Sequence, residues 1–267
     1  MQELRSRREQ GGIIVGVGTG VGLAAKCSEK AGVDLLALYH SGRFRMVGRG
    51  ALSGLLAYGD ANEIVRQMGQ EVLPLVKKTP VLAGVCGTDP FRVMEIFLGQ
   101  LKEQGWIGVQ NFPTVGIIDG RFRANLEETG MGYSLEVDMI REAHKLDLLT
   151  CPYVFDPEQA KAMTEAGADI LVAHMGLEVK DTKDFEAEAA LGICCGRLRD
   201  IIEAGRRENP DILVLCHGGS IEDPEDAAYI IREVPEIDGF FGTSSIERLA
   251  TERGMTAQAE EFKAIRR

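Results

Sequence analysis

The sequence lacks several features that would assign it to a class of protein at once. No apolar run reaches the roughly 18 residues of a membrane span, and no apolar segment suited to a signal peptide follows the charged N-terminus. The six cysteines are scattered without a C-x-x-C pair, so a disulfide framework is not indicated. These absences predict a folded cytoplasmic protein with reduced thiols.

The sequence also has fewer basic than acidic residues and lacks the common nucleotide-binding motifs. Thirty Lys and Arg residues face 41 Asp and Glu residues, and the net charge of −11 repels nucleic acid. There is no Walker loop, G-x-S-x-G elbow or dinucleotide-binding G-x-G-x-x-G, and no lysine ends a predicted strand. We therefore expect neither nucleic acid nor a membrane as partner, and no Schiff-base aldolase.

Eight short apolar runs recur along the chain, each followed by a helical pattern. They are continuous rather than alternating, as expected for parallel strands buried on both faces. The runs are Ile13–Val17, Leu35–Tyr39, Val81–Cys86, Ile107–Gln110, Leu148–Val154, Ile170–Ala173, Ile212–Cys216 and Gly239–Phe241. Eight such units in 267 residues predict an α/β fold, a (β/α)₈ TIM barrel forming a single domain over residues 1–267, with an N-terminal extension at 1–12.

Helix start and stop signals support this count. Asp residues at four predicted N-caps and Gly at two predicted C-termini have the expected spacing: Asp60, Asp89, Asp156, Asp223, Gly32 and Gly167. Ala31–Leu36 also resembles Ala166–Leu171, four units further on, which favours a closed eightfold barrel over a doubly wound open sheet.

Two connections, 41–59 and 112–132, are too long to be plain turns, and both follow strand C-termini, where barrels build their sites. In the second, Asp119-Gly120 between apolar residues predicts a β-hairpin that could act as a lid.

Polar residues are unusually frequent at the predicted strand ends, and three of the four histidines lie there. We take His40, His174 and His217 as candidate catalytic residues, because one such histidine alone is as often a packing residue, whereas three that converge indicate chemistry. His144 falls on a predicted surface helix. Candidate substrate-binding residues at the strand ends are Thr19, Ser41, Thr88, Gln110, Asn111 and Tyr153.

An anion site is predicted from two glycine-containing loops after the last two strands, where barrels often bind phosphate. These loops contribute Gly218, Gly219, Ser220, Gly242, Ser244 and Ser245. Ser244 with Glu247 also fits a capping box for the last helix. Arg43, Arg45 and Arg49 cluster after the second strand and suggest carboxylate or phosphate binding; a solvated surface cluster is the alternative.

A metal site is less clearly indicated. A zinc site built from histidines is disfavoured because no H-x-H pair occurs on a strand. Magnesium held by Asp89 and Glu128 fits better, although Asp89 also suits a helix N-cap and Glu128 could instead act as an acid or base. Cys86 and Cys216 end predicted strands and are expected to be core residues.

Seven segments together resemble the phosphoenolpyruvate hydrolase-like TIM-barrel family, and the barrel is also similar to the C-terminal half of plant tobamovirus-resistance proteins. The segments are His40–Met46, Tyr58–Asn62, Pro80–Phe91, Val109–Gly116, Asn125–Tyr133, Val172–Gly176 and Cys216–Gly219, and the likeness extends from Ile13 to Phe262. Compared with the family pattern, His40 stands where Asn is usual, and the segment 177–190 is charged where a Gly/Thr-rich loop is usual.

The resemblance implies a Mg²⁺-assisted lyase or hydrolase acting on a small phosphorylated, phosphono or 2-oxo carboxylate, similar to phosphoenolpyruvate or phosphonopyruvate. In that interpretation Arg43 and Arg45 hold the carboxylate, the two glycine loops hold a second anionic group, and His174 or Glu128 moves protons. The alternative is a ligand-sensing or protein-interaction barrel without turnover. A homo-oligomer is expected, since closed barrels with apolar helix faces often assemble symmetrically.

Overall fold

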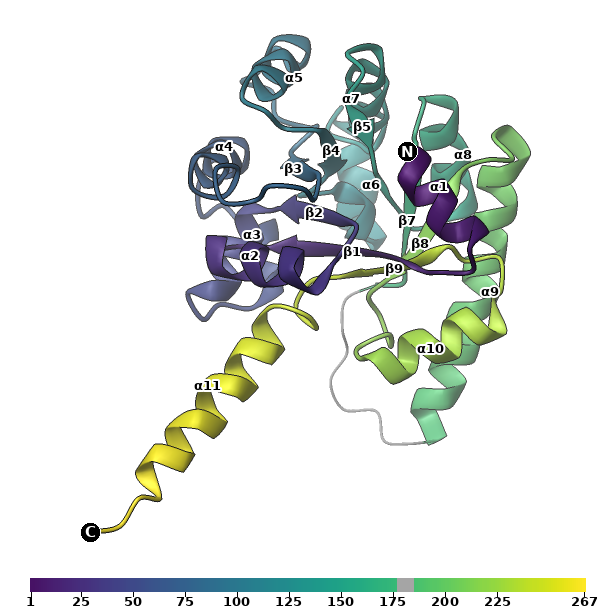
Figure 1. Cartoon of the computed structure of the whole chain (residues 1–267). Helices are drawn as coiled ribbons and strands as arrows, with labels where there is room; N and C mark the ends of the chain where they lie inside the picture. Colours follow the sequence, from purple (N-terminus) through teal and green to yellow (C-terminus); the bar gives the residue numbers. More distant parts are fainter. Residues whose placement is uncertain (177–184) are drawn as a thin grey trace.

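The computed structural model describes residues 1–176 and 185–267, with side chains described up to 176 and from 190 (Figure 1). Nine parallel strands form one sheet in the order β5-β4-β3-β2-β1-β9-β8-β7-β6. The strands are β1 (Ile14–Thr19), β2 (Leu35–Leu38), β3 (Val81–Val85), β4 (Gly108–Asn111), β5 (Leu149–Thr150), β6 (Tyr153–Val154), β7 (Ile170–His174), β8 (Leu213–His217) and β9 (Gly239–Gly242).

The sheet closes on itself through the segment that contains β5 and β6. Only Cys151 and Pro152 separate these two strands, so they are the two halves of the predicted run 148–154. The Cys151 N–H donates to Val109 O on the β4 side (3.0 Å), and the Val172 N–H of β7 donates to Pro152 O (2.8 Å). The chain is therefore an eight-unit barrel, as the eight apolar runs predict.

Helices surround this barrel. They are α1 (Gln2–Glu9), α2 (Gly22–Ala31), α3 (His40–Met46), α4 (Ala61–Val72), α5 (Met94–Glu103), α6 (Gly120–Glu128), α7 (Ser134–Lys145), α8 (Pro157–Glu165), α9 (Phe185–Glu208), α10 (Pro224–Glu233) and α11 (Arg248–Lys263), with short 3₁₀ turns η1 (Ala51–Leu55) and η2 (Val115–Ile117). None of the described helices is long and apolar enough to cross a membrane.

The apolar residues divide into two layers. Inward-facing side chains of the strands, including Leu35, Val172 and Phe241, fill the barrel, while the opposite faces of the strands pack against the helices. At the end of the barrel away from the strand C-termini, the N-terminal extension forms α1, whose Leu4 joins the inner layer and whose Arg7 pairs with Asp34 (2.7 Å). The extension therefore covers the barrel floor and leaves the opposite end for a site.

Several predicted local signals are confirmed. Asp60, Asp156 and Asp223 accept hydrogen bonds from backbone N–H groups of the first turns of α4, α8 and α10. Gly32 and Gly167 follow the ends of α2 and α8 with φ of +83° and +97°, the left-handed conformation that glycine adopts at little cost.

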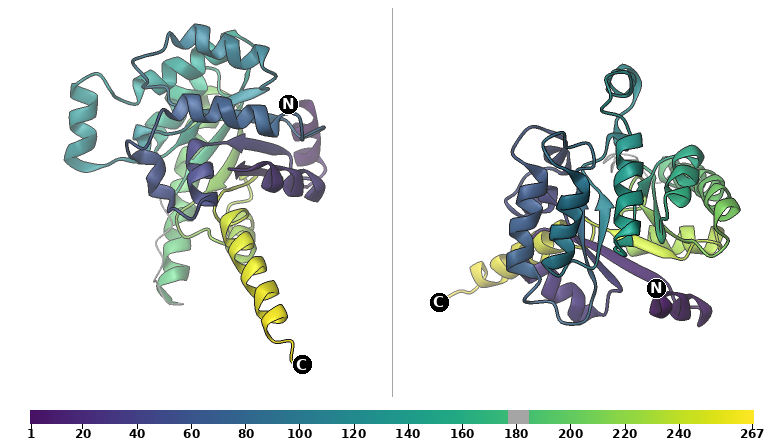
Figure 2. Two further views of the ribbon diagram at one scale, coloured as in Figure 1. Left: turned by 90° about the vertical axis from the view of Figure 1, so that its left-hand side faces the viewer. Right: turned by 90° about the horizontal axis from the view of Figure 1, so that it is seen from above.

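Three local predictions are wrong. Asp89 does not cap a helix, because α5 begins only at Met94. The Asp119-Gly120 pair does not turn a hairpin; Gly120 begins α6, which stands away from the barrel in both views of Figure 2. Ser244 does not cap the last helix, since α11 begins at Arg248 after Glu247.

The last helix also departs from the pattern of the others. α11 extends away from the barrel (Figure 1), and none of its residues is buried. Met255 and Phe262 on this helix are 70% and 69% exposed. The charged segment singled out at 177–190 begins with residues 177–184, which lie outside the described residues.

Candidate functional site

A cavity of about 460 Å³ opens at the C-terminal ends of the strands. Its size is in the range of small-molecule sites, and its position is where barrel enzymes bind substrate. The cavity is lined by Tyr39, Ser41, Arg45, Gly48, Arg49, Gly50, Ala51, Leu52, Leu55, Phe112, Ile117, Tyr153, His174, Gly176, His217, Gly218, Thr243, Ser244, Arg248 and Glu252. We call this cavity the mouth.

Two of the three predicted histidines meet in the mouth. His174 ends β7 and His217 ends β8, and their register pairs them directly. The ring centroids are 4.5 Å apart with the planes at 89°. Phe155 stacks on His174 with a centroid distance of 4.8 Å, and Tyr153 lies 5.2 Å from His217, so both rings are held by aromatic neighbours.

The backbone partners of the two rings fix opposite tautomers. The Gly176 N–H donates to His174 Nδ1 (3.1 Å), so Nδ1 is an acceptor and the neutral ring has its proton on Nε2. His217 Nδ1 lies 2.6 Å from Phe241 O, which can only accept, so His217 has its proton on Nδ1 and a lone pair on Nε2. One ring is therefore a donor and the other a base.

Burial keeps both rings neutral. Desolvation lowers the pKa of His217 to about 4, although its bond to Phe241 O opposes the shift. Desolvation, together with the neighbouring His217, places the pKa of His174 well below its usual value. At neutral pH the pair presents one N–H donor and one lone pair, the arrangement needed to move a proton.

Tyrosines form the inner wall of the mouth. Tyr39 OH donates to Gln110 Oε1, and Tyr39 OH lies 3.1 Å from Tyr153 OH. Because the Tyr39 proton is used toward Gln110, Tyr153 is the donor in the second bond. Desolvation raises the pKa of both phenols, so they are neutral donors rather than phenolates. Tyr39 therefore links Gln110 and Tyr153, both of which the sequence predicts as site residues, in one chain of hydrogen bonds. Tyr39 itself is not predicted as a site residue.

Arg45 is the one residue of the arginine cluster that is buried in the mouth. Its side chain is 3% exposed, and Nη2 lies 3.1 Å from Glu247 Oε2 and 3.3 Å from Gly18 O. Glu247 Oε1 accepts the Gly20 N–H at 2.6 Å. Burial raises the pKa of Glu247 while Arg45 opposes that shift. This pair joins α3, the β1 loop and the base of α11.

Two buried polar atoms beside this pair have no hydrogen-bond partner in the described part of the chain. They are Thr19 Oγ1 and Arg45 Nε. Unsatisfied buried polar groups are costly and often indicate a site that a ligand or water completes.

The glycine loops are only partly available to an anion. Gly218 and Ser244 line the mouth, whereas Gly219, Ser220, Gly242 and Ser245 do not. Gly218 and Gly219 have φ of +71° and +64°, and the Gly219 N–H donates to Gly176 O at 2.9 Å. The positive φ angles of these two glycines therefore allow a close contact with the loop after β7. The Gly219 N–H is already used in that contact and is not free to bind phosphate.

Other predicted residues lie outside the mouth. Arg43 pairs with Glu71 at 3.3 Å. His40, Thr88 and Asp89 line a neighbouring hollow of about 560 Å³, in which His40 Nε2 lies 2.8 Å from Gly54 O. Glu128 is exposed at the end of α6. The expected carboxylate site at Arg43 and the proton-moving role of Glu128 and His40 therefore do not fit the mouth.

Asn111 supports the mouth from behind. It donates to Glu136 Oε2 (2.6 Å) and to Tyr153 O (3.3 Å), while Glu136 also accepts from Thr114 and from the Val115 N–H (2.7 Å). Glu136 is fully buried, and desolvation raises its pKa to about 7. The sequence gives no signal for Glu136 beyond one acid on an amphipathic helix.

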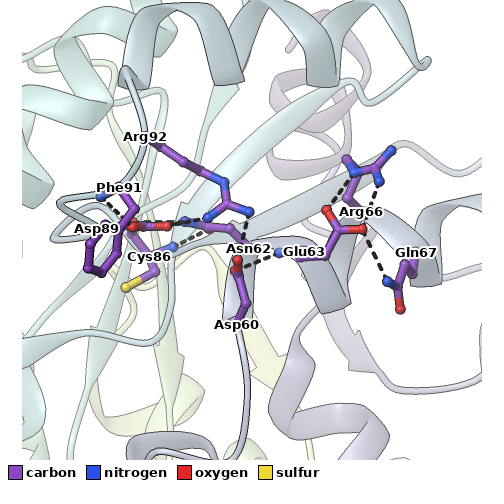
Figure 3. Close-up of polar contacts among 9 residues, drawn as sticks. All are labelled: Asp60, Asn62, Glu63, Arg66, Gln67, Cys86, Asp89, Phe91 and Arg92. Carbon is purple, nitrogen blue, oxygen red and sulfur yellow. Dashed lines mark hydrogen bonds and ion pairs between the residues drawn. The ribbon is translucent and has the colours of Figure 1, made fainter.

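The donors present do not fit the expected magnesium site. Asp89 accepts from Asn62 (2.9 Å), Arg92 (2.5 Å) and the Phe91 N–H (2.9 Å), as Figure 3 shows. Although burial favours the protonated acid, these bonds keep the pKa of Asp89 below its usual value. Among the described residues no group of three or more His, Cys, Asp or Glu side chains is arranged to hold a metal ion.

Solved structures share this architecture. 2,3-dimethylmalate lyase, a PEP mutase/isocitrate lyase superfamily member, superposes with a TM-score of 0.60 at 15% identity, covering 98% of this chain and 86% of that one. Phosphonopyruvate hydrolase in complex with oxalate and Mg²⁺ gives 0.59 at 15% identity, covering 99% and 88%. These likenesses confirm the TIM-barrel fold of this protein.

The chain belongs to the phosphoenolpyruvate hydrolase-like family, whose sequence profile matches residues 1–265. It is 54% identical over 265 residues to the ToMV susceptible protein tm-1 of Solanum lycopersicum, covering 99% of this chain and 35% of the tomato protein. A putative transcriptional regulatory protein of Sinorhizobium fredii is 32% identical over 253 residues, covering 94% of this chain and 41% of the bacterial protein. The chain thus spans well under half the length of these curated relatives.

Proposed function

We propose that this protein is a lyase or hydrolase whose mouth binds a small 2-oxo, phosphono or phosphorylated carboxylate and whose histidine pair moves its protons. The observation that carries the proposal is the pairing of opposite tautomers at the ends of β7 and β8. Two neutral imidazoles at 4.5 Å offer a base and a donor to the same ligand.

Each residue has a role that its contacts support. His217 Nε2 accepts a proton from the carbon next to a carbonyl, and His174 Nε2–H donates a hydrogen bond to the oxygen on which charge develops. Arg49 is the main residue that attracts the anionic group, because Glu247 neutralises Arg45 and Glu252 pairs with Arg248. Tyr153 lies against both histidine rings and keeps them in place.

The described residues do not fit a magnesium ion in the mouth. The solved phosphonopyruvate hydrolase is a complex with Mg²⁺, but Asp89 is already bonded to three partners here and Glu128 lies outside the mouth. We therefore place the charge stabilisation on the arginines and the His174 N–H.

Deuterium exchange tests the proposal. Pyruvate and phosphonopyruvate are incubated with the protein in D₂O, and loss of the C3 proton signal is followed by NMR. We expect catalysed exchange of at least one acid, a fall of roughly 10²-fold or more in His217→Gln, and no change in His144→Gln, whose ring is exposed on α7. Exchange that is absent, or that survives in His217→Gln, refutes the proposed chemistry.

A second candidate function is ligand sensing. Arg248 and Glu252 of the projecting helix α11 line the mouth, so a bound anion contacts the helix that extends furthest from the barrel. One relative is described as a putative transcriptional regulatory protein. Tight binding of a carboxylate with no proton exchange and no product would favour this function over catalysis.

We also propose a homo-oligomer in which α11 packs against a second copy. A 16-residue helix with no buried residue and with exposed Met255 and Phe262 gains little stability by itself. Sedimentation velocity should show a species larger than the 29.1 kDa monomer, reduced by Phe262→Glu; a monomer at micromolar concentration contradicts this.

A further inference from the structure

The mouth is larger and more apolar than a three-carbon acid requires. A compound of about ten heavy atoms, such as a three-carbon phosphono acid, fills on the order of 300 Å³ if each atom occupies about the 30 Å³ share of a water molecule. The cavity measures about 460 Å³. The remaining volume of roughly 160 Å³ is enough for about five further heavy atoms, close to the size of a branched alkyl group or an aryl ring.

The unused part of the wall is apolar. Leu52 and Leu55 of η1, Ile117 of η2 and Phe112 before it all line the mouth. Leu52 is 55% exposed, so a ligand that covers it removes apolar surface from water. These four residues come from the two long connections, 41–59 and 112–132.

Phe112 is held as a fixed face of this wall. Its ring lies 5.1 Å from Tyr39 in an edge-on arrangement and 6.2 Å from Tyr153. Its orientation therefore does not depend on a ligand, and it presents an aromatic surface on which a ring or branched chain can pack.

The charged residues of the mouth suit a ligand with a single anionic group. Arg45 is neutralised by Glu247, and Arg248 shares its charge with the exposed Glu252 at 3.0 Å. Arg49 makes no ion pair with any described residue and lines the mouth beside Gly50 and Ala51. One carboxylate with an uncharged body matches this distribution better than a doubly anionic ligand does.

From these observations we infer that the natural ligand is a 2-oxo or hydroxy carboxylate that bears an aryl or branched alkyl substituent, which packs against Leu52, Phe112 and Ile117. The inference rests on the proposed function for the identity of the site. It adds the chemical class of the substituent and the residues that select it.

Calorimetric titration with two probes of equal charge, pyruvate and phenylpyruvate, tests the inference. We expect phenylpyruvate to bind at least tenfold more tightly. Leu52→Asn should weaken the binding of phenylpyruvate roughly three- to tenfold and leave the affinity for pyruvate unchanged, because only the phenyl substituent covers Leu52. The matched control is Leu56→Asn, since Leu56 is 57% exposed on the same connection but lines the neighbouring hollow instead of the mouth.

Equal affinity for the two acids overturns the inference, and so does an aryl preference that Leu52→Asn leaves intact. The outcome is separable from that of the proposed reaction. An aryl preference lost in Leu52→Asn without any proton exchange supports this inference and counts only against the reaction. Proton exchange with no aryl preference counts only against the inference.

Discussion

Removing the charge of Glu247 is the sharpest test of how the mouth is held together. Glu247→Gln keeps the size of the side chain and an oxygen for the Gly20 N–H, which lies 2.6 Å from the carboxylate. It removes the charge opposite Arg45, whose side chain is only 3% exposed. The perturbation therefore isolates the ion pair from the hydrogen bond.

The expected cost is large because the remaining charge is buried. Breaking a buried pair by removing one partner costs about 3–5 kcal/mol. At about 2–4 °C for each kcal/mol in a chain of this size, the Tm should fall by roughly 6–20 °C. The Nη2 bond to Gly18 O remains, so the lower half of this range is expected.

Differential scanning fluorimetry measures this shift against two controls. Glu252→Gln breaks the Arg248–Glu252 pair, whose side chains are 21% and 55% exposed, and should cost no more than about 1 kcal/mol. The double variant Arg45→Met, Glu247→Met removes both charges and should recover much of the lost stability. If Glu247→Gln is as mild as Glu252→Gln, or if the double variant is no more stable than the single one, the electrostatic reasoning is refuted.

Three further predictions concern titration and ligand binding. Because the pKa of His217 is lowered to about 4, its neutral ring stabilises the fold above pH 6.5, and this contribution is lost as the pH falls through 4. In urea unfolding, the free energy of unfolding of the wild type should therefore fall by about 3 kcal/mol more than that of His217→Gln between pH 6.5 and pH 4. The raised pKa of Glu136, about 7, has the opposite sign: its stabilisation is present below about pH 4.5 and is lost as the pH rises through 7, so Glu136→Gln should gain about 3 kcal/mol relative to the wild type between pH 5 and 9. Arg49→Ala should weaken carboxylate binding about tenfold in calorimetry, whereas Arg43→Ala, which only breaks the contact with Glu71, should leave it unchanged.

The strands and their closure could be predicted from the sequence because burial on both faces leaves a strong pattern. Runs such as Leu35–Tyr39 and Ile212–Cys216 are apolar throughout, and each coincides with all or most of a strand. Helix starts at Asp156 and Asp223 could be predicted for a local reason, since the carboxylate and the following proline act within one turn.

The same Asp-Pro signal misleads at Asp89 because partners distant in sequence take its carboxylate. Asn62 comes from α4, and Arg92 also bonds Asp60, so the loop is fixed by tertiary contacts that no local pattern contains (Figure 3). Gly120 has a positive φ, which is compatible with either a hairpin turn or the start of a helix. The local sequence does not distinguish the two, and the packing of the chain decides between them.

The arginine cluster divides for a geometric reason. Arg43 and Arg45 lie on α3, and two residues along a helix turn the side chain by about 200°, so they point to opposite sides. The sequence predicts a loop there, in which all three arginines could reach one ligand. At the end of β2, consecutive residues likewise face opposite ways, so Tyr39 enters the barrel and His40 enters the neighbouring hollow.

A pKa of about 4 makes His217 a weak base, and a bound carboxylate would raise that pKa. A unit negative charge about 4 Å from the ring stabilises the imidazolium by on the order of 4 kcal/mol at an effective dielectric constant of about 20, which corresponds to about three pKa units. Such a ligand would move the pKa of His217 from about 4 toward 7, the value that suits a general base at neutral pH. If the proposed function is correct, His217 would be a weak base without ligand and a stronger one beside an anion, so a preference for carboxylates would follow from the burial of the histidines as well as from the arginines at the rim.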